Sequence, residues 1–228
     1  YSYDDIEKLE KFLSAKPVAE REKGIALLED VACYAETSSN RRKILLNYFG
    51  ESFDEINGLG AKMDDNSINP KHKIEVKDYI LNVIKVIREN NQTKKIKDLA
   101  KILISHDIEI PNNLFPSDDV KEDIKNSIGK IFWKSIIRNM MVNGLVEKKT
   151  EDYGVVKLTG KGTGFQNNPE SILISIDNNF NDHHHNKQVI KKKHFSSDEK
   201  LHNILIAERL KLSDEFNMPP FAIFQESS

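Results

Sequence analysis

The sequence predicts a mainly α-helical protein with a small β component, and three observations lead to this prediction. Apolar residues recur at three- and four-residue steps over most of residues 6–49 and 74–142, the spacing that places them on one face of a helix. Two short apolar runs, 145–149 and 155–158, flank a turn and predict a β-hairpin. Helical spacing returns over residues 198–212.

Composition limits the class of protein. The chain has 228 residues, with 34 Lys and Arg against 36 Asp and Glu, so the formal net charge of −2 does not by itself indicate a nucleic-acid binder. No run approaches the ~20 apolar residues of a membrane helix, and we expect a cytoplasmic protein without a membrane partner. The single cysteine, Cys33, excludes an intrachain disulfide and a cysteine-based zinc cluster. The chain opens at Tyr1 without Met, and we expect a fragment of a longer protein.

The first predicted domain spans residues 1–73. Its helices cover much of residues 6–49 and form a helical hairpin, interrupted at Pro17 because proline cannot continue a helix. Gly, Asn and Pro then cluster between residues 50 and 73, which predicts a loop.

The second predicted domain spans residues 74–176 and has the element order of a winged helix. An amphipathic helix over residues 76–87 precedes a shorter one over 96–103, and a third helix runs over roughly 120–142. The predicted hairpin follows as the wing. Residues 171–176 could supply one more strand.

The last two zones are a linker and a partial helical segment. Residues 177–197 are polar and contain His183–His185 and Lys191–Lys193. Adjacent histidines do not readily face one ion, so we interpret this zone as a solvated linker and not as a metal site. Residues 198–228 begin at Asp198, a suitable N-cap for a helix.

No catalytic site is predicted. The glycine-rich segment 160–164 follows a strand of the hairpin, and its lysine stands between the glycines. A phosphate loop needs Gly, four spacers and Gly-Lys-Ser/Thr opening a helix, so we interpret this segment as a simple turn. Cys33 lies in an apolar helical stretch and is typical of a core position.

The strongest functional signal is a set of basic residues at helical spacing. Lys130, Lys134 and Arg138 stand four residues apart and share one face of the third helix, where three cations would meet DNA phosphates. Tyr153 stands at the tip of the hairpin, where an aromatic ring could stack on a base pair. The alternative interpretation is an ordinary solvated face. Further cations on the hairpin are Lys148, Lys149, Lys157 and Lys161.

Three parts of the chain resemble RecQ DNA helicases. The start of their zinc-binding subdomain resembles two segments here, Tyr-Ala-Glu-Thr and Arg-Arg…Asn-Tyr-Phe-Gly-Glu. Their winged-helix (RQC) domain resembles three segments, Phe-Trp-Lys-Ser-Ile-Ile-Arg, Gly-Leu-Val and Val-Lys-Leu-Thr-Gly-Lys-Gly. The opening of their HRDC domain is similar to the segment that ends in Met-Pro-Pro-Phe-Ala-Ile-Phe. These segments are residues 34–37, 41–51, 132–138, 144–146, 156–162 and 201–224.

One departure from the family concerns zinc. The family usually places four cysteines around its first segment, but here Asn40 stands at the first position, and Met63 and Asn66 stand where Cys-Asp-x-Cys is expected. Asn and Met are poor substitutes for thiolates at a structural zinc site. The resemblance therefore implies a zinc-less branch with no metal in this fragment. We expect turns, and hydrogen bonds from Asn and Asp to the backbone, to hold the loop of residues 51–70.

The resemblance implies the C-terminal part of an ATP-dependent 3′-to-5′ DNA helicase of repair and recombination, which holds duplex DNA at the fork. The motor domains, with ATP and Mg, would precede Tyr1, so we expect no ATPase activity or cofactor in this fragment. The expected partners are duplex DNA, duplex/single-strand junctions and possible repair proteins. Residues 198–228 would be a truncated start of HRDC. For Arg41 and Arg42, salt bridges that brace the helical pair are an equal alternative to DNA contact. The side chains expected to contact DNA are Lys130, Lys134, Arg138, Lys148, Lys149, Tyr153, Lys157, Arg41 and Arg42.

Two alternatives from other functional classes remain open. Winged helices often bind proteins, and the acidic stretch around residues 118–123 would repel DNA on that flank. A sequence-specific transcription regulator would read base edges, for which Asn139 and Asn143 are suited. Phosphate contacts release counterions, so three to five of them predict a log–log salt slope of roughly −3 to −4.5, which a protein partner need not show.

Overall fold

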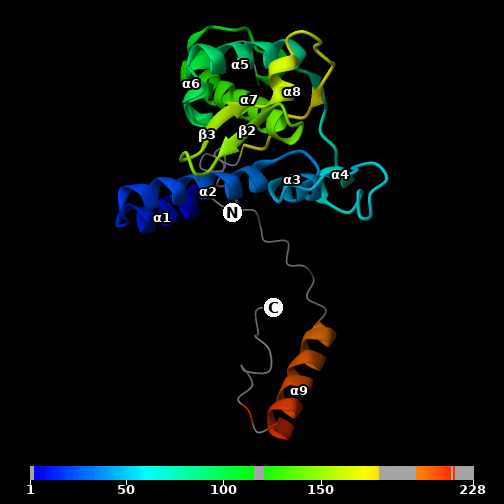
Figure 1. The fold of residues 1–228 in the computed structure, drawn as a ribbon. Coiled ribbons are helices and arrows are strands. Elements are labelled where there is room, and N and C mark those ends of the chain that lie inside the picture. Colours follow the sequence, from blue (N-terminus) through cyan, green and yellow to red (C-terminus); the bar gives the residue numbers. More distant parts are fainter. Residues whose placement is uncertain (1–2, 116–120, 180–198, 217, 219–228) are drawn as a thin grey trace. The chain divides into compact units, whose positions relative to one another are not determined.

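The computed structural model describes residues 3–115, 121–179, 199–216 and 218 (Figure 1). The chain divides into two compact units, residues 1–181 and residues 182–228. The two predicted N-terminal domains therefore belong to one compact unit, and the boundary lies within the predicted linker. The predictions for the histidine run, the lysine run and Asp198 fall outside the described residues.

The first predicted domain is helical, as expected. Its helices are α1 (Tyr3–Ser14), α2 (Val18–Glu36), α3 (Arg41–Tyr48) and the single-turn α4 (Asp65–Ile68). Pro17 is the N-cap of α2, the position at which a proline's missing N–H costs least. The loop predicted between residues 50 and 73 is largely confirmed, and only α4 interrupts its turns.

The predicted order of helices and hairpin in the second domain is confirmed. Its elements are β1 (Ile74–Glu75), α5 (Lys77–Glu89), α6 (Ile96–Ser105), a 3₁₀ turn (Asn112–Leu114), α7 (Glu122–Val142), β2 (Val146–Lys149), β3 (Val155–Leu158), α8 (Gly160–Gly164) and β4 (Leu173–Ile174).

Two small antiparallel sheets tie this domain together within the described residues. Strands β2 and β3 form the predicted hairpin, with Val146 opposite Leu158. Lys95, just before α6, adds a bridge to Val155. Strand β4 pairs with β1 through Ile174 and Ile74, which confirms the extra strand expected in residues 171–176.

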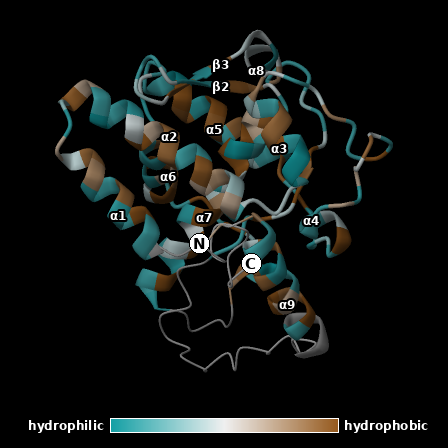
Figure 2. Ribbon diagram, turned by 90° about the horizontal axis from the view of Figure 1, so that it is seen from below, coloured by the Kyte–Doolittle hydropathy of each residue, from teal (hydrophilic) through white to brown (hydrophobic). Residues whose placement is uncertain are grey.

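The core lies among α5, α6 and α7. Phe132 and Trp133 are fully buried there, and the ring of Tyr79 packs edge-on against Phe132 with centroids 4.9 Å apart. Burying one large apolar side chain contributes about 1.5–3 kcal/mol, so these three helices supply much of the stability. Figure 2 shows hydrophobic positions along all three helices.

Helix α7 is the central helix of the unit and is covered on both sides. It contacts α5 and α6 on one side and α3 on the other, and α2 runs below the hairpin in Figure 1. Successive residues of a helix are about 100° apart around its axis. Because several consecutive residues of α7 are buried, the buried positions lie around its whole circumference and not on one face. The expectation of three exposed cations on one face of α7 is therefore wrong for Arg138, whereas Lys130 is exposed. The buried residues of α7 are Gly129, Phe132, Trp133, Ser135, Ile136, Ile137, Arg138 and Met140.

Residues 160–164 form a short helix, α8, instead of the simple turn predicted. The hydroxyl of Thr159 caps it by accepting from the backbone N–H of Gly162 at 3.0 Å. A Cβ at Gly162 would lie 1.9 Å from the carbonyl oxygen of Leu145. Glycine is needed here because the backbone of α8 packs directly against the chain entering β2.

The second unit contains α9 (Glu199–Phe216), which confirms a helix after residue 198. The backbone N–H of Met218 donates to the carbonyl oxygen of Ser213 at 3.0 Å and so closes its C-terminal end. Among the helices that the structure describes, none is long and apolar enough to cross a membrane.

Candidate nucleic-acid interface

Arg138 lies in a buried ion network. Its Nη1 is 2.8 Å from Oε2 of Glu36 and 2.9 Å from Oδ2 of Asp177, and only 9% of its side chain is exposed. Both of its carboxylate partners are internal to the chain. The expectation that Arg138 contacts DNA phosphate from an exposed face is therefore wrong, because packing against α2 buries it.

Asp177 belongs to the folded unit and not to a linker. Its backbone N–H donates to Oγ of Ser135 at 3.0 Å, and its Oδ1 accepts from the backbone N–H of Ser38 at 3.3 Å. Nearby, Oγ of Ser38 donates to the carbonyl oxygen of Ser175 at 2.9 Å. The predicted start of the linker at residue 177 is thus too early, because the first linker residues serve as partners for α7 and the end of α2.

Lys134 and Lys130 have different surroundings. Lys134 is half-buried and lines a cavity of about 140 Å³ together with Glu29 and Cys33 of α2. Desolvation there, and the charge of Arg138, lower the pKa of Lys134, and burial raises the pKa of the Cys33 thiol to about 11. Lys130 is exposed. The three cations therefore lie on the same side of the helix, but they do not form one accessible surface.

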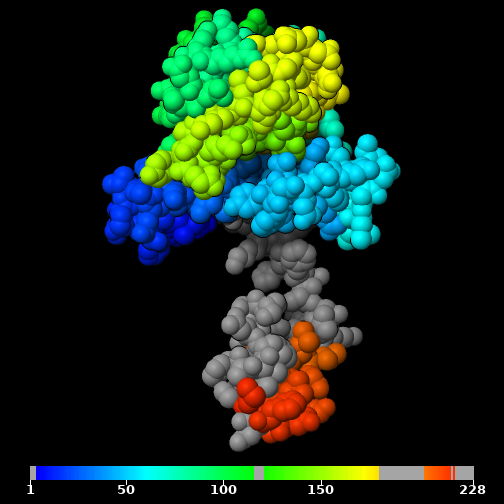
Figure 3. All heavy atoms as spheres, viewed as in Figure 1, coloured from blue at the N-terminus to red at the C-terminus, as the bar shows by residue number. Residues whose placement is uncertain are grey.

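The hairpin lies against α2. Lys148 forms an ion pair with Asp30, and its Nζ donates to the carbonyl oxygen of Ala26 at 2.8 Å. Its side chain is 7% exposed, so Lys148 is not available as the expected DNA contact. Gly154, with φ of +87°, brings the turn so close that a Cβ would lie 3.2 Å from that of Ala26. Figure 3 shows the hairpin, in yellow-green, resting on the blue helices.

The outer cations of the hairpin, Lys149 and Lys157, are partly exposed and paired. Nζ of Lys149 is 2.7 Å from Oε1 of Glu147, and Lys157 pairs with Asp152. The hydrogen bond from Lys157 lowers the pKa of Asp152, and the hydrogen bond to Glu147 raises the pKa of Lys149. Tyr153 stands in the connecting turn with φ of +59° and is 41% exposed, so its ring is accessible as predicted.

Arg41 and Arg42 both brace the first domain. Arg41 donates two hydrogen bonds to the carboxylate of Asp65, from Nε at 2.6 Å and from Nη2 at 2.9 Å. Its Nη1 donates to the carbonyl oxygen of Tyr34 at 2.6 Å. Arg42 donates to the carbonyl oxygen of Leu59. The bracing alternative is thus confirmed for Arg41, whose charge is used within the chain.

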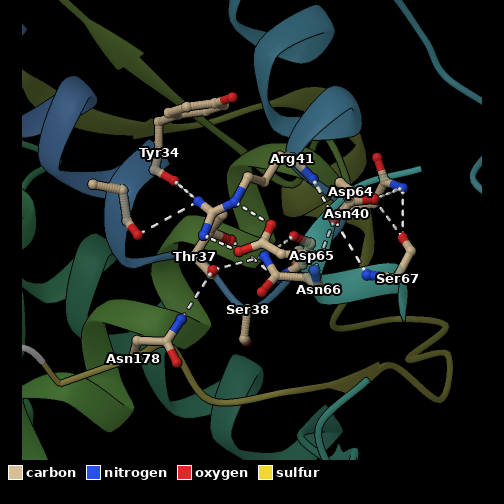
Figure 4. Close-up of polar contacts among 12 residues, drawn as sticks. Tyr34, Thr37, Ser38, Asn40, Arg41, Asp64, Asp65, Asn66, Ser67 and Asn178 are labelled. Atoms are coloured by element: carbon tan, nitrogen blue, oxygen red, sulfur yellow. Dashed lines mark hydrogen bonds and ion pairs between the residues drawn. The ribbon is translucent and has the colours of Figure 1, made fainter. Parts of the chain in front are cut away.

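Asn40 stands where the family's first zinc cysteine is expected and is the centre of a hydrogen-bonded clasp (Figure 4). Its Nδ2 donates to the carbonyl oxygen of Ala61 at 2.8 Å, to Oδ2 of Asp64 at 2.7 Å and to Oγ of Ser67 at 2.9 Å. Its Oδ1 accepts from the backbone N–H of Lys43 at 3.0 Å. Every polar atom of this side chain therefore holds the loop to the start of α3.

The same clasp extends through Asn66. Its Nδ2 donates to the carbonyl oxygens of Thr37 and Ser39 at 2.9 and 2.8 Å, and Oδ1 of Asp64 accepts from the backbone N–H of Asn66 at 3.2 Å. These contacts confirm the prediction that Asn and Asp hydrogen bonds to backbone hold this loop.

The residues of the clasp do not fit a zinc ion. An amide Nδ2 that donates hydrogen bonds has no lone pair for a metal, and zinc prefers thiolate or imidazole ligands. Met63 is 76% exposed. Among the residues that the structure describes, no three His, Cys, Asp or Glu side chains lie close enough to hold a metal ion.

A polar cleft that the sequence patterns do not reveal lies between the two domains. It has a volume of about 520 Å³ and runs between the loop before β1, the C-terminal end of α7 and β4. Three of its four basic residues come from the loop of residues 50–73, predicted only as a turn-rich segment, and the fourth lies in α3. Their one sequence signal is Lys71-His72-Lys73, two lysines close together. The basic lining residues are Lys43, Lys62, Lys71 and Lys73.

Comparison with known families gives two matches. Residues 3–60 match the RecQ zinc-binding family, and residues 124–183 match the RQC domain family. No curated protein matches the chain. The likeness of residues 198–228 to an HRDC domain stays a prediction, and three of the four cleft lysines lie outside both matches.

Proposed function

We propose that this chain, which carries the RecQ zinc-binding and RQC domains of the C-terminal region of a RecQ-family helicase, holds duplex DNA at the fork. The observation that carries the proposal is the presence of both domains in one chain, in the family's order. The motor domains of the parent protein would use ATP and Mg to unwind DNA with 3′-to-5′ polarity, in repair and recombination. The described domains would supply the duplex binding.

The contacts proposed for the duplex are those whose charges are accessible. Lys130 is exposed, and no ion pair involves it among the described residues. Lys149 and Lys157 are in surface ion pairs, which contribute only about 0–1 kcal/mol, so a phosphate can replace the carboxylate at little cost. Tyr153 supplies a ring at the hairpin tip for the terminal base pair, where stacking on one base is worth about 1–3 kcal/mol.

Arg138 and Lys148 support this surface without touching DNA. Each is buried against α2 by carboxylate partners, and together they fix the hairpin and α7 relative to the first domain. A wing held in this way presents Tyr153 at a defined place. Removing either cation should therefore weaken DNA binding only as far as it disturbs the fold.

The proposal is tested by fluorescence anisotropy of the fragment with a duplex carrying a 3′ single-stranded tail, titrated across salt. We expect binding to weaken as salt is added. The Lys130→Ala/Lys149→Ala/Lys157→Ala variant should bind more weakly, and its slope of log affinity against log salt concentration should be smaller by roughly three units. Lys8→Ala/Lys11→Ala/Lys85→Ala, which removes the same charge from α1 and α5, is the matched control. A folded fragment that binds no DNA at low salt would contradict the proposal.

The regulator alternative is separated by comparing two unrelated junction sequences of equal length. Equal affinity favours the fork-holding function, and a strong preference for one sequence favours a regulator.

A protein-interaction function is the second candidate, and one observation favours it. Apolar side chains of α2 and α3 remain exposed around a cleft of about 460 Å³, and exposed apolar patches of this kind mark interaction sites. Figure 2 shows the hydrophobic segments of both helices in the view from below. A partner that binds this face would show no steep salt slope. The exposed residues are Leu27, Val31, Leu45, Tyr48 and Phe49.

A further inference from the structure

We propose that a single strand of nucleic acid lies in the polar cleft between the two domains, with its phosphates held by Lys62, Lys71 and Lys73. The inference rests on the proposed DNA-binding function and names a second contact, separate from the hairpin. The cleft joins the loop of the first domain to α7 and β4 of the second. A strand held here would therefore bridge both domains at a point where they are already packed together.

The first argument is charge. Elsewhere in the described unit the cations expected to bind DNA are mostly neutralised by carboxylates of the same chain. In the cleft, no described residue forms an ion pair with Lys62, Lys71 or Lys73, and Glu55 is the single carboxylate of the wall. Nζ of Lys43 lies 3.2 Å from Oε1 of Glu55 and neutralises it. Three lysines that form no ion pair with a described residue thus share one concave surface, which focuses their field on an anion.

The second argument is desolvation. The ammonium of Lys71 is close enough to the walls that loss of water lowers its pKa, against the opposing charge of Asp177. Its Nζ donates a long hydrogen bond to the carbonyl oxygen of Ile176 at 3.4 Å. The ammonium group has thus lost some of its water and, among the described residues, has few hydrogen bonds to replace it. A phosphate would stabilise this group, because charge-assisted hydrogen bonds are about twice as strong as neutral ones.

The third argument is the chemistry of the walls. Hydroxyl and amide side chains, among them Ser39, Asn66 and Asn143, line the cleft between the lysines. Ile56 and Leu173 also line it and are 70% and 58% exposed. Cations and polar groups beside accessible apolar side chains suit a strand that offers both phosphates and the flat faces of unpaired bases. A small inorganic anion would leave the apolar part of the cleft unused.

The first test measures binding of a single-stranded oligo-dT across salt. We expect Lys62→Ala/Lys71→Ala/Lys73→Ala to weaken binding and to flatten the log–log salt slope by about two units, since each single-strand phosphate contact contributes about 0.7. Replacing the same three lysines by arginine should restore both. Lys8→Ala/Lys11→Ala/Lys85→Ala removes the same charge outside the cleft and should leave the slope unchanged.

The outcomes separate this inference from the proposed function. If the triple alanine variant binds oligo-dT as the wild type does, the cleft is not the strand site, while wild-type binding to tailed duplex still supports fork holding. If the wild type binds neither DNA, both proposals fail. Polyglutamate that displaces oligo-dT and itself binds through the three lysines would assign the cleft to an acidic polypeptide and overturn the inference.

A second measurement does not depend on the variants folding. Wild-type protein is cross-linked by light to an oligo-dT in which some thymines are replaced by 5-iodouracil, and the modified peptides are identified by mass spectrometry. Cross-links within residues 55–73 and 171–175 support the cleft. Cross-links confined to the hairpin around Tyr153 would contradict it.

Discussion

Arg138 and Asp177 form a buried ion pair, with Nη1 and Oδ2 2.9 Å apart. One residue lies in α7, and the other follows β4, where a linker is predicted. Glu36, at the end of α2, contacts the same guanidinium at 2.8 Å. Segments from both predicted domains and from the predicted linker thus meet at one cation. We infer that this contact makes the zinc-binding-like domain and the winged helix a single structural body.

Removing Arg138 should therefore destabilise the whole first unit. Arg138→Ala leaves two carboxylates near each other without a cation, and breaking a buried pair in this way costs about 3–5 kcal/mol. Urea unfolding followed by circular dichroism measures the loss. Lys149→Ala, which breaks an exposed pair with Glu147, should change the free energy of unfolding by less than about 0.5 kcal/mol. Equal effects of the two substitutions would contradict the assigned role of Arg138.

The side chain of Asn40 should contribute more to the free energy of unfolding than that of Met63, although both stand at expected zinc positions. Asn40→Ala removes an N-cap and leaves the carbonyl of Ala61 without its partner, for an expected cost of about 1–3 kcal/mol. Met63→Ala should be nearly neutral, since that side chain is 76% exposed.

A chelator gives an independent check of the same clasp. We expect EDTA to leave the unfolding midpoint of the wild type unchanged. Stoichiometric zinc bound by residues 40–66 in the purified protein, lost together with stability on chelation, would show that the clasp does not act without metal.

The ion pair of Arg41 and Asp65 should make the first domain sensitive to acid. The hydrogen bond from Arg41 lowers the pKa of Asp65 below its ordinary value of 3.8. The stability that this pair contributes is complete above that ordinary value and is lost as the pH falls through the lowered one. Asp65→Asn should therefore reduce the loss of unfolding free energy between about pH 5 and pH 2. In an Arg41→Ala background the same substitution should have little further effect, and a full effect there would argue against the pair.

Gly162 and Gly160 should respond oppositely to alanine. A Cβ at Gly162 would lie 1.9 Å from the carbonyl oxygen of Leu145, whereas a Cβ at Gly160 meets nothing within 4 Å. Gly162→Ala should cost about 1–3 kcal/mol or more, because the backbone has to move. Gly160→Ala should be neutral or stabilising by up to about 1 kcal/mol, since alanine favours a helix. Thermal unfolding of both variants decides this, and a neutral Gly162→Ala would show that α8 does not pack as described.

Helices and strands of this protein are predictable from its sequence because their signals are local. The apolar spacing around Ile80 and Leu99 produces α5 and α6, Pro17 separates α1 from α2, and the runs at Val146 and Val156 pair as β2 and β3. The Asn and Asp residues of the loop of residues 51–70 likewise act on nearby backbone. Both matched domains agree with the resemblance stated from their motifs.

Which cations can meet a ligand is decided by the tertiary structure. Helical spacing places Arg138 on the same face as Lys130 and Lys134, but it carries no information on what covers that face. Glu36 and Asp30, the α2 partners of Arg138 and Lys148, are about one hundred residues away in the sequence. Lys62, Lys71 and Lys73 are the reverse case, since their sequence neighbourhood is an ordinary loop and only folding brings them together in one cleft without an ion pair to any described residue. Sequence periodicity thus determines the helices and the hairpin, whereas long-range ion pairing and burial, which depend on distances through space, determine which charges remain available.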